Sequence, residues 1–232
     1  MSDWKYQLGV IVPSFNTTME YEFWRMAPPG VSIHSSRIAH TEDTDEAFLH
    51  MVQVAPEAAQ LLAHAKVKAI LFACTAASFV RPGIDQEVIR NIEAATQTPT
   101  TTTATAIKEA LDQFGVKAVS IASPYPQELN DLLAKYLQSF GFKIVSQKGL
   151  NVECPAFLPP EHAYQVAKDV NRKETEAIVI SCTNFRSLEV VEQLEKELGK
   201  PVISSNTAAM WGLLRLAGIK ERIPGAGRLL NQ

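Results

Sequence analysis

Runs of consecutive aliphatic residues recur along the chain, and segments with apolar residues at helical spacing lie between them. The clearest aliphatic runs are residues 8–13, 68–73, 118–123 and 176–181. Uninterrupted runs of this kind are typical of parallel strands buried on both faces, and the intervening helices supply the crossovers. Residues 31–38 and 143–148 predict one further strand in each half of the chain. The pattern therefore predicts an α/β fold built on parallel sheets.

Apolar residues at intervals of three and four predict the helices, and a glycine after each predicts where it ends. The predicted helices are 105–114, 129–140, 188–198 and 208–217, followed by Gly115, Gly141, Gly199 and Gly218. Thr17 and Glu20 have the spacing of a capping box, which predicts another helix start there. The β-branched run 100–103 favours a strand.

The two halves of the chain repeat the same order of elements. A Cys-Thr step ends an aliphatic run in each half, at Cys74-Thr75 and again at Cys182-Thr183. We therefore expect two similar lobes, each a parallel sheet flanked by helices, related by a pseudo-twofold axis with the active site between them.

The lobe boundaries follow from this repeat. Residues 1–103 with 207–232 are predicted to form the first lobe, and residues 104–206 the second. The last helix then returns to pack on the first lobe, and a cleft between the lobes can close on a ligand and exclude water.

Composition narrows the function classes. The chain has 232 residues, 46% of them hydrophobic, and a net charge of −3 with dispersed Lys and Arg, which argues against nucleic-acid binding. No apolar run approaches the ~20 residues needed to cross a bilayer, and no signal segment is recognisable, so we expect a cytoplasmic protein. The histidines show no metal-ligand spacing and no glycine-rich phosphate loop occurs, so no cofactor is expected. Exposed helix faces leave a homodimer possible.

Cys74 and Cys182 follow strands at the sheet edge where open parallel sheets bind ligands. Helix N-termini after them, with the Thr75 and Thr183 hydroxyls, are suited to carboxylates, and the same field favours a thiolate. A lone strand cysteine is more often structural. Repetition of the step favours a functional pair, whereas Cys154 has no repeat partner and is interpreted as a loop thiol.

Other loop residues have two interpretations each. Asn16 follows the first strand and either donates to a ligand carboxylate or bonds its own turn. Tyr125 occupies the equivalent loop of the second half and either presents its hydroxyl to the ligand or is a structural tyrosine. Arg81 and Arg186 follow the two Cys-Thr loops, but exposed structural arginines are common.

The motifs together resemble a known family. They are Pro13-Ser14-x-Asn16-Thr17-Thr18-Met19-Glu20, Ala73-Cys74-Thr75, Ser123-Pro124-Tyr125 and Ser181-Cys182-Thr183-Asn184-x-Arg186. In this order they are similar to maleate cis-trans isomerases of the aspartate/glutamate racemase superfamily, which includes the arylmalonate decarboxylases.

The resemblance implies a cofactor-free reaction on a small dicarboxylate. Cys74 would add to an alkene carbon of maleate, and elimination after bond rotation would release fumarate. Cys182 would act as acid and base. The substrate-binding residues implied are Ser14, Asn16, Tyr125, Asn184 and the backbone amides of Thr75 and Thr183.

One loop departs from the family pattern. An Asn that binds the second carboxylate is expected after the strand ending near Gly149, but the register puts Glu153 or Cys154 there, with Asn151 nearby. A carboxylate at that place would repel a dicarboxylate, so the substrate could carry another group at that end.

Three alternatives remain open. Racemisation of an acidic amino acid and decarboxylation of a malonate derivative use the same fold, although arylmalonate decarboxylases lack the first-half cysteine. A non-catalytic dicarboxylate-binding protein is the third.

Overall fold

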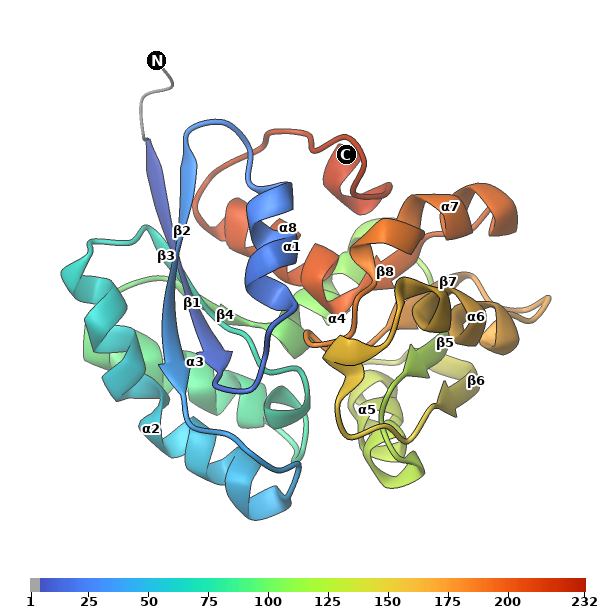
Figure 1. Ribbon diagram of the computed structural model, residues 1–232, viewed down its shortest axis with the longest axis horizontal. Helices are drawn as coiled ribbons and strands as arrows, with labels where there is room; N and C mark the ends of the chain where they lie inside the picture. Colours follow the sequence, from blue (N-terminus) through green and yellow to red (C-terminus); the bar gives the residue numbers. More distant parts are fainter. Residues whose placement is uncertain (1–4) are drawn as a thin grey trace.

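The computed structural model describes residues 5–232. Figure 1 shows two α/β halves side by side. Each half contains a four-stranded parallel sheet, with strand order β2-β1-β3-β4 in the first and β6-β5-β7-β8 in the second. Corresponding strands therefore take the same place in both sheets. The predicted α/β fold of two similar parallel sheets is confirmed.

The strands are short and mostly buried. The first sheet contains β1 (Tyr6–Pro13), β2 (Val31–Ile38), β3 (Ala69–Phe72) and β4 (Thr100–Thr102), and the second contains β5 (Ala118–Ser123), β6 (Lys143–Gly149), β7 (Ala177–Ile180) and β8 (Val202–Ser204). The central strands of each sheet are covered by helices on both faces, which explains their uninterrupted aliphatic sequences.

Helices connect these strands in the same order twice. The first half contains α1 (Met19–Met26), α2 (Asp45–His64), α3 (Ile84–Thr96) and α4 (Thr103–Phe114), and the second contains α5 (Gln127–Ser139), α6 (Pro160–Val170), α7 (Leu188–Leu198) and α8 (Ser205–Leu216). Short 3-10 helices follow at Ala76–Ser78, Pro155–Phe157 and Leu229–Asn231. The predicted bounds hold for α7. Helix α8 begins earlier than expected because Ser204 and Thr207 form a capping box.

The predicted capping box at Thr17 and Glu20 is wrong. Helix α1 begins at Met19, and Thr18 at its N-cap makes no side-chain capping bond. Instead, Asn16 Oδ1 accepts hydrogen bonds from the N–H groups of Thr18 and Met19, both at 3.0 Å. An Asn two residues before the N-cap accepts from the first N–H groups here, which the Thr-x-x-Glu spacing did not reveal.

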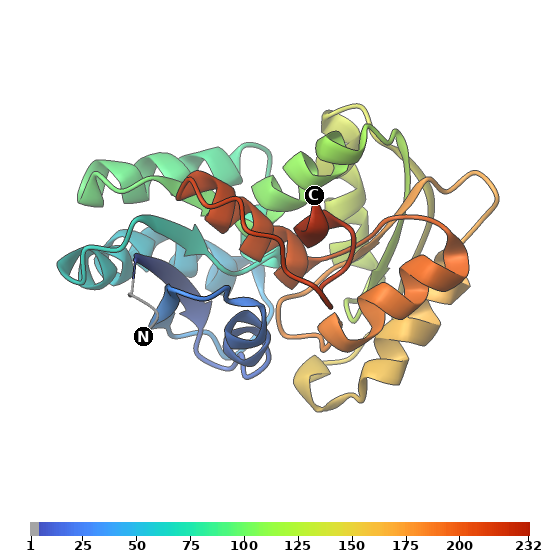
Figure 2. The ribbon, with the colours of Figure 1, turned by 90° about the horizontal axis from the view of Figure 1, so that it is seen from above.

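Helices α4 and α8 pack against each other between the two sheets (Figure 2). Each follows the last strand of its own sheet. A Cβ at Gly212 would lie 3.0 Å from the Ala106 Cβ, so the glycine permits this close crossing. Helix α8 also contacts β3 and β4 of the first sheet.

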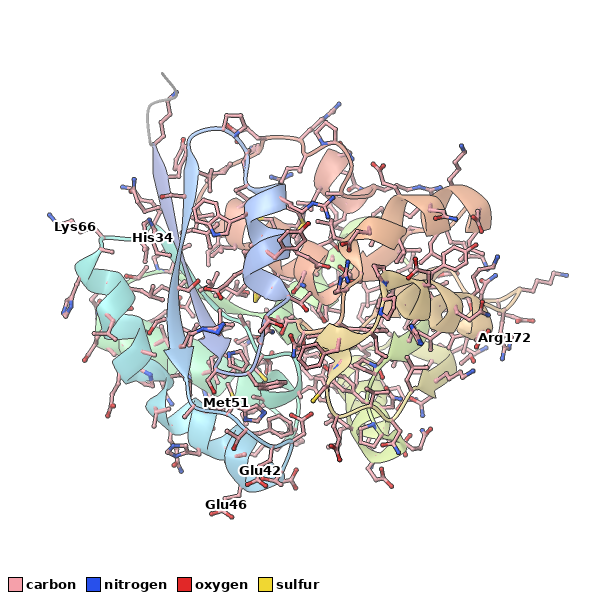
Figure 3. All side chains as sticks on the ribbon, in the orientation of Figure 1. His34, Glu42, Glu46, Met51, Lys66 and Arg172 are labelled. Carbon is pink, nitrogen blue, oxygen red and sulfur yellow. The ribbon has the colours of Figure 1, made fainter. Side chains whose placement is uncertain are left out.

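Most charged side chains lie at the periphery, as Figure 3 shows for Glu46, Lys66 and Arg172, but Glu22, Asp85 and Glu195 are buried. No helix in the described part of the chain is both long and apolar enough to cross a membrane. Residues 5–232 also contain no cluster of three or more His, Cys, Asp or Glu side chains placed to hold a metal ion.

Candidate active site

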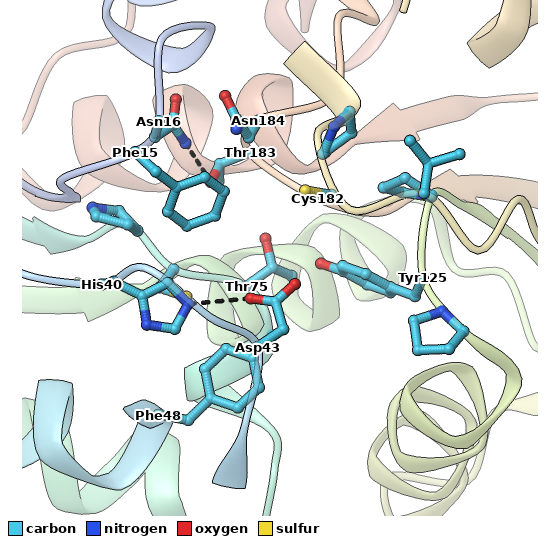
Figure 4. Close-up of a pocket in the computed structure, with 17 residues that line it drawn as sticks. Phe15, Asn16, His40, Asp43, Phe48, Thr75, Tyr125, Cys182, Thr183 and Asn184 are labelled. Carbon is cyan, nitrogen blue, oxygen red and sulfur yellow. Dashed lines mark hydrogen bonds and ion pairs between the residues drawn. The ribbon is translucent and has the colours of Figure 1, made fainter. Parts of the chain in front are cut away.

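A small cavity lies where the carboxyl ends of the two sheets face each other, and both predicted thiols, Cys74 and Cys182, line it. Asn16, Thr75, Tyr125, Thr183 and Asn184 line it too (Figure 4). The space free inside it is about 40 Å³, enough for a few water molecules. The cavity therefore suits a small substrate.

Cys74 follows β3 and is buried. Its desolvation raises the pKa of the thiol to about 12, although the N–H groups of Ala77 and Ala76 point to the sulfur and lower it. The negative charge of Asp43 acts in the same direction as burial. The expectation that the helix N-terminus favours a thiolate is therefore wrong, because desolvation outweighs the field of the N–H groups.

Cys182 follows β7 and is half-buried. Its φ of +101° lies in the region that L-residues rarely adopt, so the backbone is strained at this thiol. Its N–H donates to Ser205 Oγ at 3.0 Å, which holds the strained turn. Burial raises the pKa of this thiol to about 12 as well, while the N–H of Asn184 and the Tyr125 hydroxyl lower it.

The threonine hydroxyls join the two halves. Thr75 Oγ1 donates to Ser205 Oγ at 3.0 Å, and Thr183 Oγ1 donates to the Ala73 carbonyl at 3.1 Å. Asn16 Nδ2 donates to Thr183 Oγ1 at 3.0 Å. The expectation that these hydroxyls bind a carboxylate is not met, because their hydrogens are already used within the protein.

Backbone N–H groups remain available for an anion. Within residues 5–232, those of Thr75 and Thr183 have no protein acceptor. Asn16 bonds its own turn through Oδ1, as one of its two interpretations predicted, and its Nδ2 donates to Thr183 Oγ1 of the other half. Tyr125 is buried, which raises the pKa of its phenol, and its hydroxyl accepts from Ser181 Oγ at 3.4 Å.

A buried carboxylate, that of Glu22 in α1, supports the Cys182 loop from behind. Its Oε1 accepts from the N–H groups of Ser187 and Leu188 at the start of α7, at 2.9 and 3.0 Å. Its Oε2 accepts from Asn206 Nδ2 at 2.6 Å, and the same amide donates to the Thr183 carbonyl. Desolvation raises the pKa of Glu22, and the three donors offset part of that cost.

Gly149 at the end of β6 allows the Tyr125 loop to approach. A Cβ there would overlap the Tyr125 carbonyl oxygen and the Asn130 amide. Leu150 and Asn151 then bond back to this loop through their N–H groups.

The loop after Gly149, which departs from the family pattern, places different residues at the cavity than expected. Glu153 and Cys154 are exposed and do not line it, whereas Val152 and Pro155 do. The expectation of Glu153 or Cys154 in the pocket is therefore wrong. Asn151 has a φ of +53° and is also exposed. The 3-10 turn that starts at Pro155 directs the loop this way.

Three further residues lie outside the cavity. Ser14 Oγ donates to the His40 carbonyl and accepts from the His40 N–H, so this hydroxyl fixes a loop and does not line the cavity. Arg81 pairs with Glu87 at 2.6 Å and Arg186 with Glu189 at 3.3 Å, both at the surface.

Sequence reasoning missed His40 and Asp43. They follow β2, line the cavity and form a hydrogen bond of 3.0 Å between His40 Nε2 and Asp43 Oδ1. Phe15 and Phe48, also at the cavity, pack on the His40 ring. The rule that ligands bind beyond the carboxyl ends of parallel strands applies to the strand 31–38 too and could have found them.

Comparisons with known proteins agree with this architecture. A model of the arylmalonate decarboxylase family matches residues 8–230. Maleate isomerase of Nocardia farcinica is 31% identical over 240 residues, covering 97% of this chain and 96% of the relative.

Two solved structures are similar to the whole chain. Maleate isomerase Iso of Pseudomonas putida S16 superimposes with a TM-score of 0.93 at 27% identity, covering 97% of this chain and 98% of that one. A mutant of Nocardia farcinica maleate cis-trans isomerase with a covalently bound succinylcysteine intermediate superimposes with a TM-score of 0.92 at 29% identity, covering 98% of both chains. The chain therefore belongs to the arylmalonate decarboxylase family, together with the maleate isomerases that it resembles over nearly its full length.

Proposed function

We propose that the protein isomerises a small cis-unsaturated dicarboxylate, maleate to fumarate, by reversible addition of a thiol. One observation carries the proposal: Cys74 and Cys182, from equivalent strand ends, line the same small cavity. The relatives named as maleate isomerases, and the succinylcysteine intermediate described for one of them, support it.

The reaction adds S and H across the double bond and then removes them. The Cys74 sulfur bonds to one alkene carbon while Cys182 gives its proton to the other. Both thiols are protonated at neutral pH, so the proton of Cys74 passes to the Cys182 sulfur as the C–S bond forms. Rotation about the new single bond precedes the reverse steps, which release the trans isomer. Electrons and protons balance without an oxidant or a cofactor.

Binding groups stabilise the charge that develops during addition. The free N–H groups of Thr75 and Thr183 would bind one carboxylate, with Asn184 beside them. Preorganised donors in a site from which water is excluded supply much of such catalysis. Tyr125 would orient the substrate against Cys182, whose sulfur its hydroxyl faces.

Proton NMR of purified protein with maleate tests the proposal. We expect fumarate from the parent and from Cys154→Ser, because the Cys154 thiol is exposed and outside the cavity. Cys74→Ser should lose on the order of 10⁴-fold in kcat/KM, since serine is a far weaker nucleophile near neutral pH. Unchanged maleate at high protein concentration, or full activity in Cys74→Ser, would contradict it.

A second candidate is decarboxylation of a malonate derivative. The description of the matching family model suggests it, and the apolar cavity residues Phe15, Phe48, Val152 and Pro155 favour it. Release of CO₂ from an arylmalonate, undiminished in Cys74→Ser, would support this reaction in place of isomerisation.

We further propose the lobe assignment of residues 1–103 with 207–232 and residues 104–206. The packing of α8 on β3 and β4 supports it. A homodimer and a cytoplasmic location stay predictions.

A further inference from the structure

The cavity holds an acidic side chain that the proposed reaction does not use. Asp43 precedes Thr44, the N-cap of α2, and lines the cavity with Thr75 and Tyr125. Figure 4 shows its carboxylate among the side chains that surround the cavity. Its side chain is 44% exposed, so it lies at the mouth, where a substrate enters and one end of it would rest.

His40 holds this carboxylate in place. Its side chain is fully buried, and its Nε2 lies 3.0 Å from Asp43 Oδ1. The imidazole packs between Phe15 and Phe48, with ring centroids 5.2 and 5.1 Å away. A buried ring that packs against two aromatic side chains and bonds at its edge has little freedom to turn, so the Asp43 carboxylate keeps its position toward the cavity.

The His40–Asp43 pair has a net negative charge, which is that of the Asp43 carboxylate. His40 Nδ1 is buried and has no partner within the described residues. A cationic ring would bury an N–H donor there without an acceptor, whereas a neutral ring that donates Nε2–H to Asp43 leaves only a lone pair unpaired. No Lys or Arg is among the described residues that line the cavity. Nothing in the lining therefore neutralises Asp43.

The two ends of the cavity thus favour different substrate groups. The free N–H groups of Thr75 and Thr183 suit a carboxylate, which accepts hydrogen bonds. The Asp43 carboxylate repels a second anion and instead accepts a bond from a donor. A primary amide has nearly the shape of a carboxylate but carries no charge and has two N–H donors, so charge and hydrogen-bond donation separate the two, not shape.

We propose that Asp43 makes the protein prefer the half-amide of the cis-dicarboxylate, with one carboxylate and one primary amide, over maleate itself. This inference rests on the proposed isomerase function and concerns the same site. The amide end binds beside Asp43, and the carboxylate end binds the backbone N–H groups. The bonds made and broken are those of the maleate reaction, so the product is the trans half-amide and no further reactant is needed.

The test measures kcat/KM for maleate and for its half-amide in the parent, in Asp43→Asn and in Glu42→Gln. An amide can differ from a carboxylate in intrinsic reactivity, but the change in the substrate ratio between variants removes that difference. Glu42→Gln deletes the same charge one residue away, on a side chain that does not line the cavity and lies at the outer edge (Figure 3).

We expect the half-amide to maleate ratio to fall about tenfold or more in Asp43→Asn, equivalent to about 1.4 kcal/mol, mainly through faster turnover of maleate. The ratio should stay within about twofold in Glu42→Gln, because this side chain does not line the cavity and solvent screens its charge from the substrate. Asp43→Ser provides a second variant and should show the same fall.

An unchanged ratio in both Asp43 variants, or a parent that prefers maleate, would overturn the inference while leaving isomerisation intact. A parent protein that converts neither substrate would instead contradict the proposed isomerase function. The two failures are therefore distinguishable.

Discussion

The Cys74 and Cys182 segments occupy the same place in two sheets of identical strand order, yet they differ in backbone and exposure. Cys74 is buried and has no positive φ, whereas Cys182 is half-buried with a φ of +101°. Ser205 Oγ holds the N–H of Cys182 and receives the hydroxyl hydrogen of Thr75. Duplication therefore places two thiols at one cavity, and neighbouring side chains then make their environments unequal.

This difference fits the unequal roles proposed for the thiols. A nucleophile benefits from a fixed position against the reacting carbon, which burial on regular backbone provides. A proton donor needs a protonated thiol beside the second carbon, and the strained turn points Cys182 into the cavity. The same change made in each segment tests whether the two thiols have separate roles.

Serine in place of each cysteine should have unequal effects on activity. Cys74→Ser loses the nucleophile, so we expect a fall on the order of 10⁴-fold in kcat/KM. Cys182→Ser keeps an O–H donor, so we expect a smaller loss, about 10²-fold. Initial rates of fumarate formation measure both. Equal losses of kcat/KM in the two variants would contradict separate roles for the two thiols.

Alkylation by iodoacetamide compares thiol accessibility and ionisation. A pKa raised from 9.0 to about 12 lowers the thiolate fraction about a thousandfold near neutral pH. Peptide mass mapping should therefore find exposed Cys154 modified first, then half-buried Cys182, and Cys74 last.

The same pKa shift has a consequence for stability. The folded protein favours the protonated thiols, and ionisation favours the unfolded chain. The stability that the buried protonated thiols contribute is therefore complete below pH 9 and is lost as pH rises toward 12. Rapid modification of Cys74 at pH 7 would contradict the raised pKa.

Removal of the Glu22 carboxylate tests the support behind the Cys182 loop. Glu22→Ala leaves the buried N–H groups of Ser187 and Leu188 without an acceptor, so we expect a loss of about 3 kcal/mol in the free energy of unfolding. Glu20→Ala on the same helix breaks only a surface pair with Arg37 and should cost less than about 1 kcal/mol. Urea unfolding compares the two variants, and similar midpoints would show that the Glu22 carboxylate does not stabilise the Cys182 loop.

Glycine and alanine at each cysteine measure the backbone strain itself. At position 182, glycine relieves the positive φ, so Cys182→Gly should be about 1 kcal/mol more stable than Cys182→Ala. At position 74 we expect the opposite order: Cys74→Ala should be about 1 kcal/mol more stable than Cys74→Gly, because glycine there only increases the entropy of the unfolded chain. Thermal unfolding of the four variants gives both differences. A Cys182→Ala variant as stable as Cys182→Gly, or more stable, would show that the backbone at Cys182 is not strained.

Local patterns predicted the fold well. Aliphatic runs predicted the strands, and glycines predicted the ends of α4, α5, α7 and α8 to within one residue, whereas the ends of the other four helices were not predicted. The repeated Cys-Thr step located the cavity. Contacts between the two halves could not be predicted, because they join residues far apart in the sequence. Thr183 bonds the Ala73 carbonyl and Glu22 bonds the start of α7, and neither pairing has a local signal.

The position of the acidic residue at the cavity could not be predicted from the sequence either. The sequence suggested an acid at the cavity, at Glu153, but the structure has Asp43 there, from the loop after β2. Register within an irregular loop depends on turns such as that at Pro155, which residue spacing does not specify.

Covalent capture of the substrate by Cys74 tests the central claim most directly. Cys182→Ser incubated with maleate and analysed by intact mass and peptide mapping should carry one added substrate mass on Cys74, and Cys74→Ser should carry none. Substrate mass on Cys182 of Cys74→Ser, or turnover by the parent with no adduct on Cys74 under any quench, would contradict thiol addition from the first half.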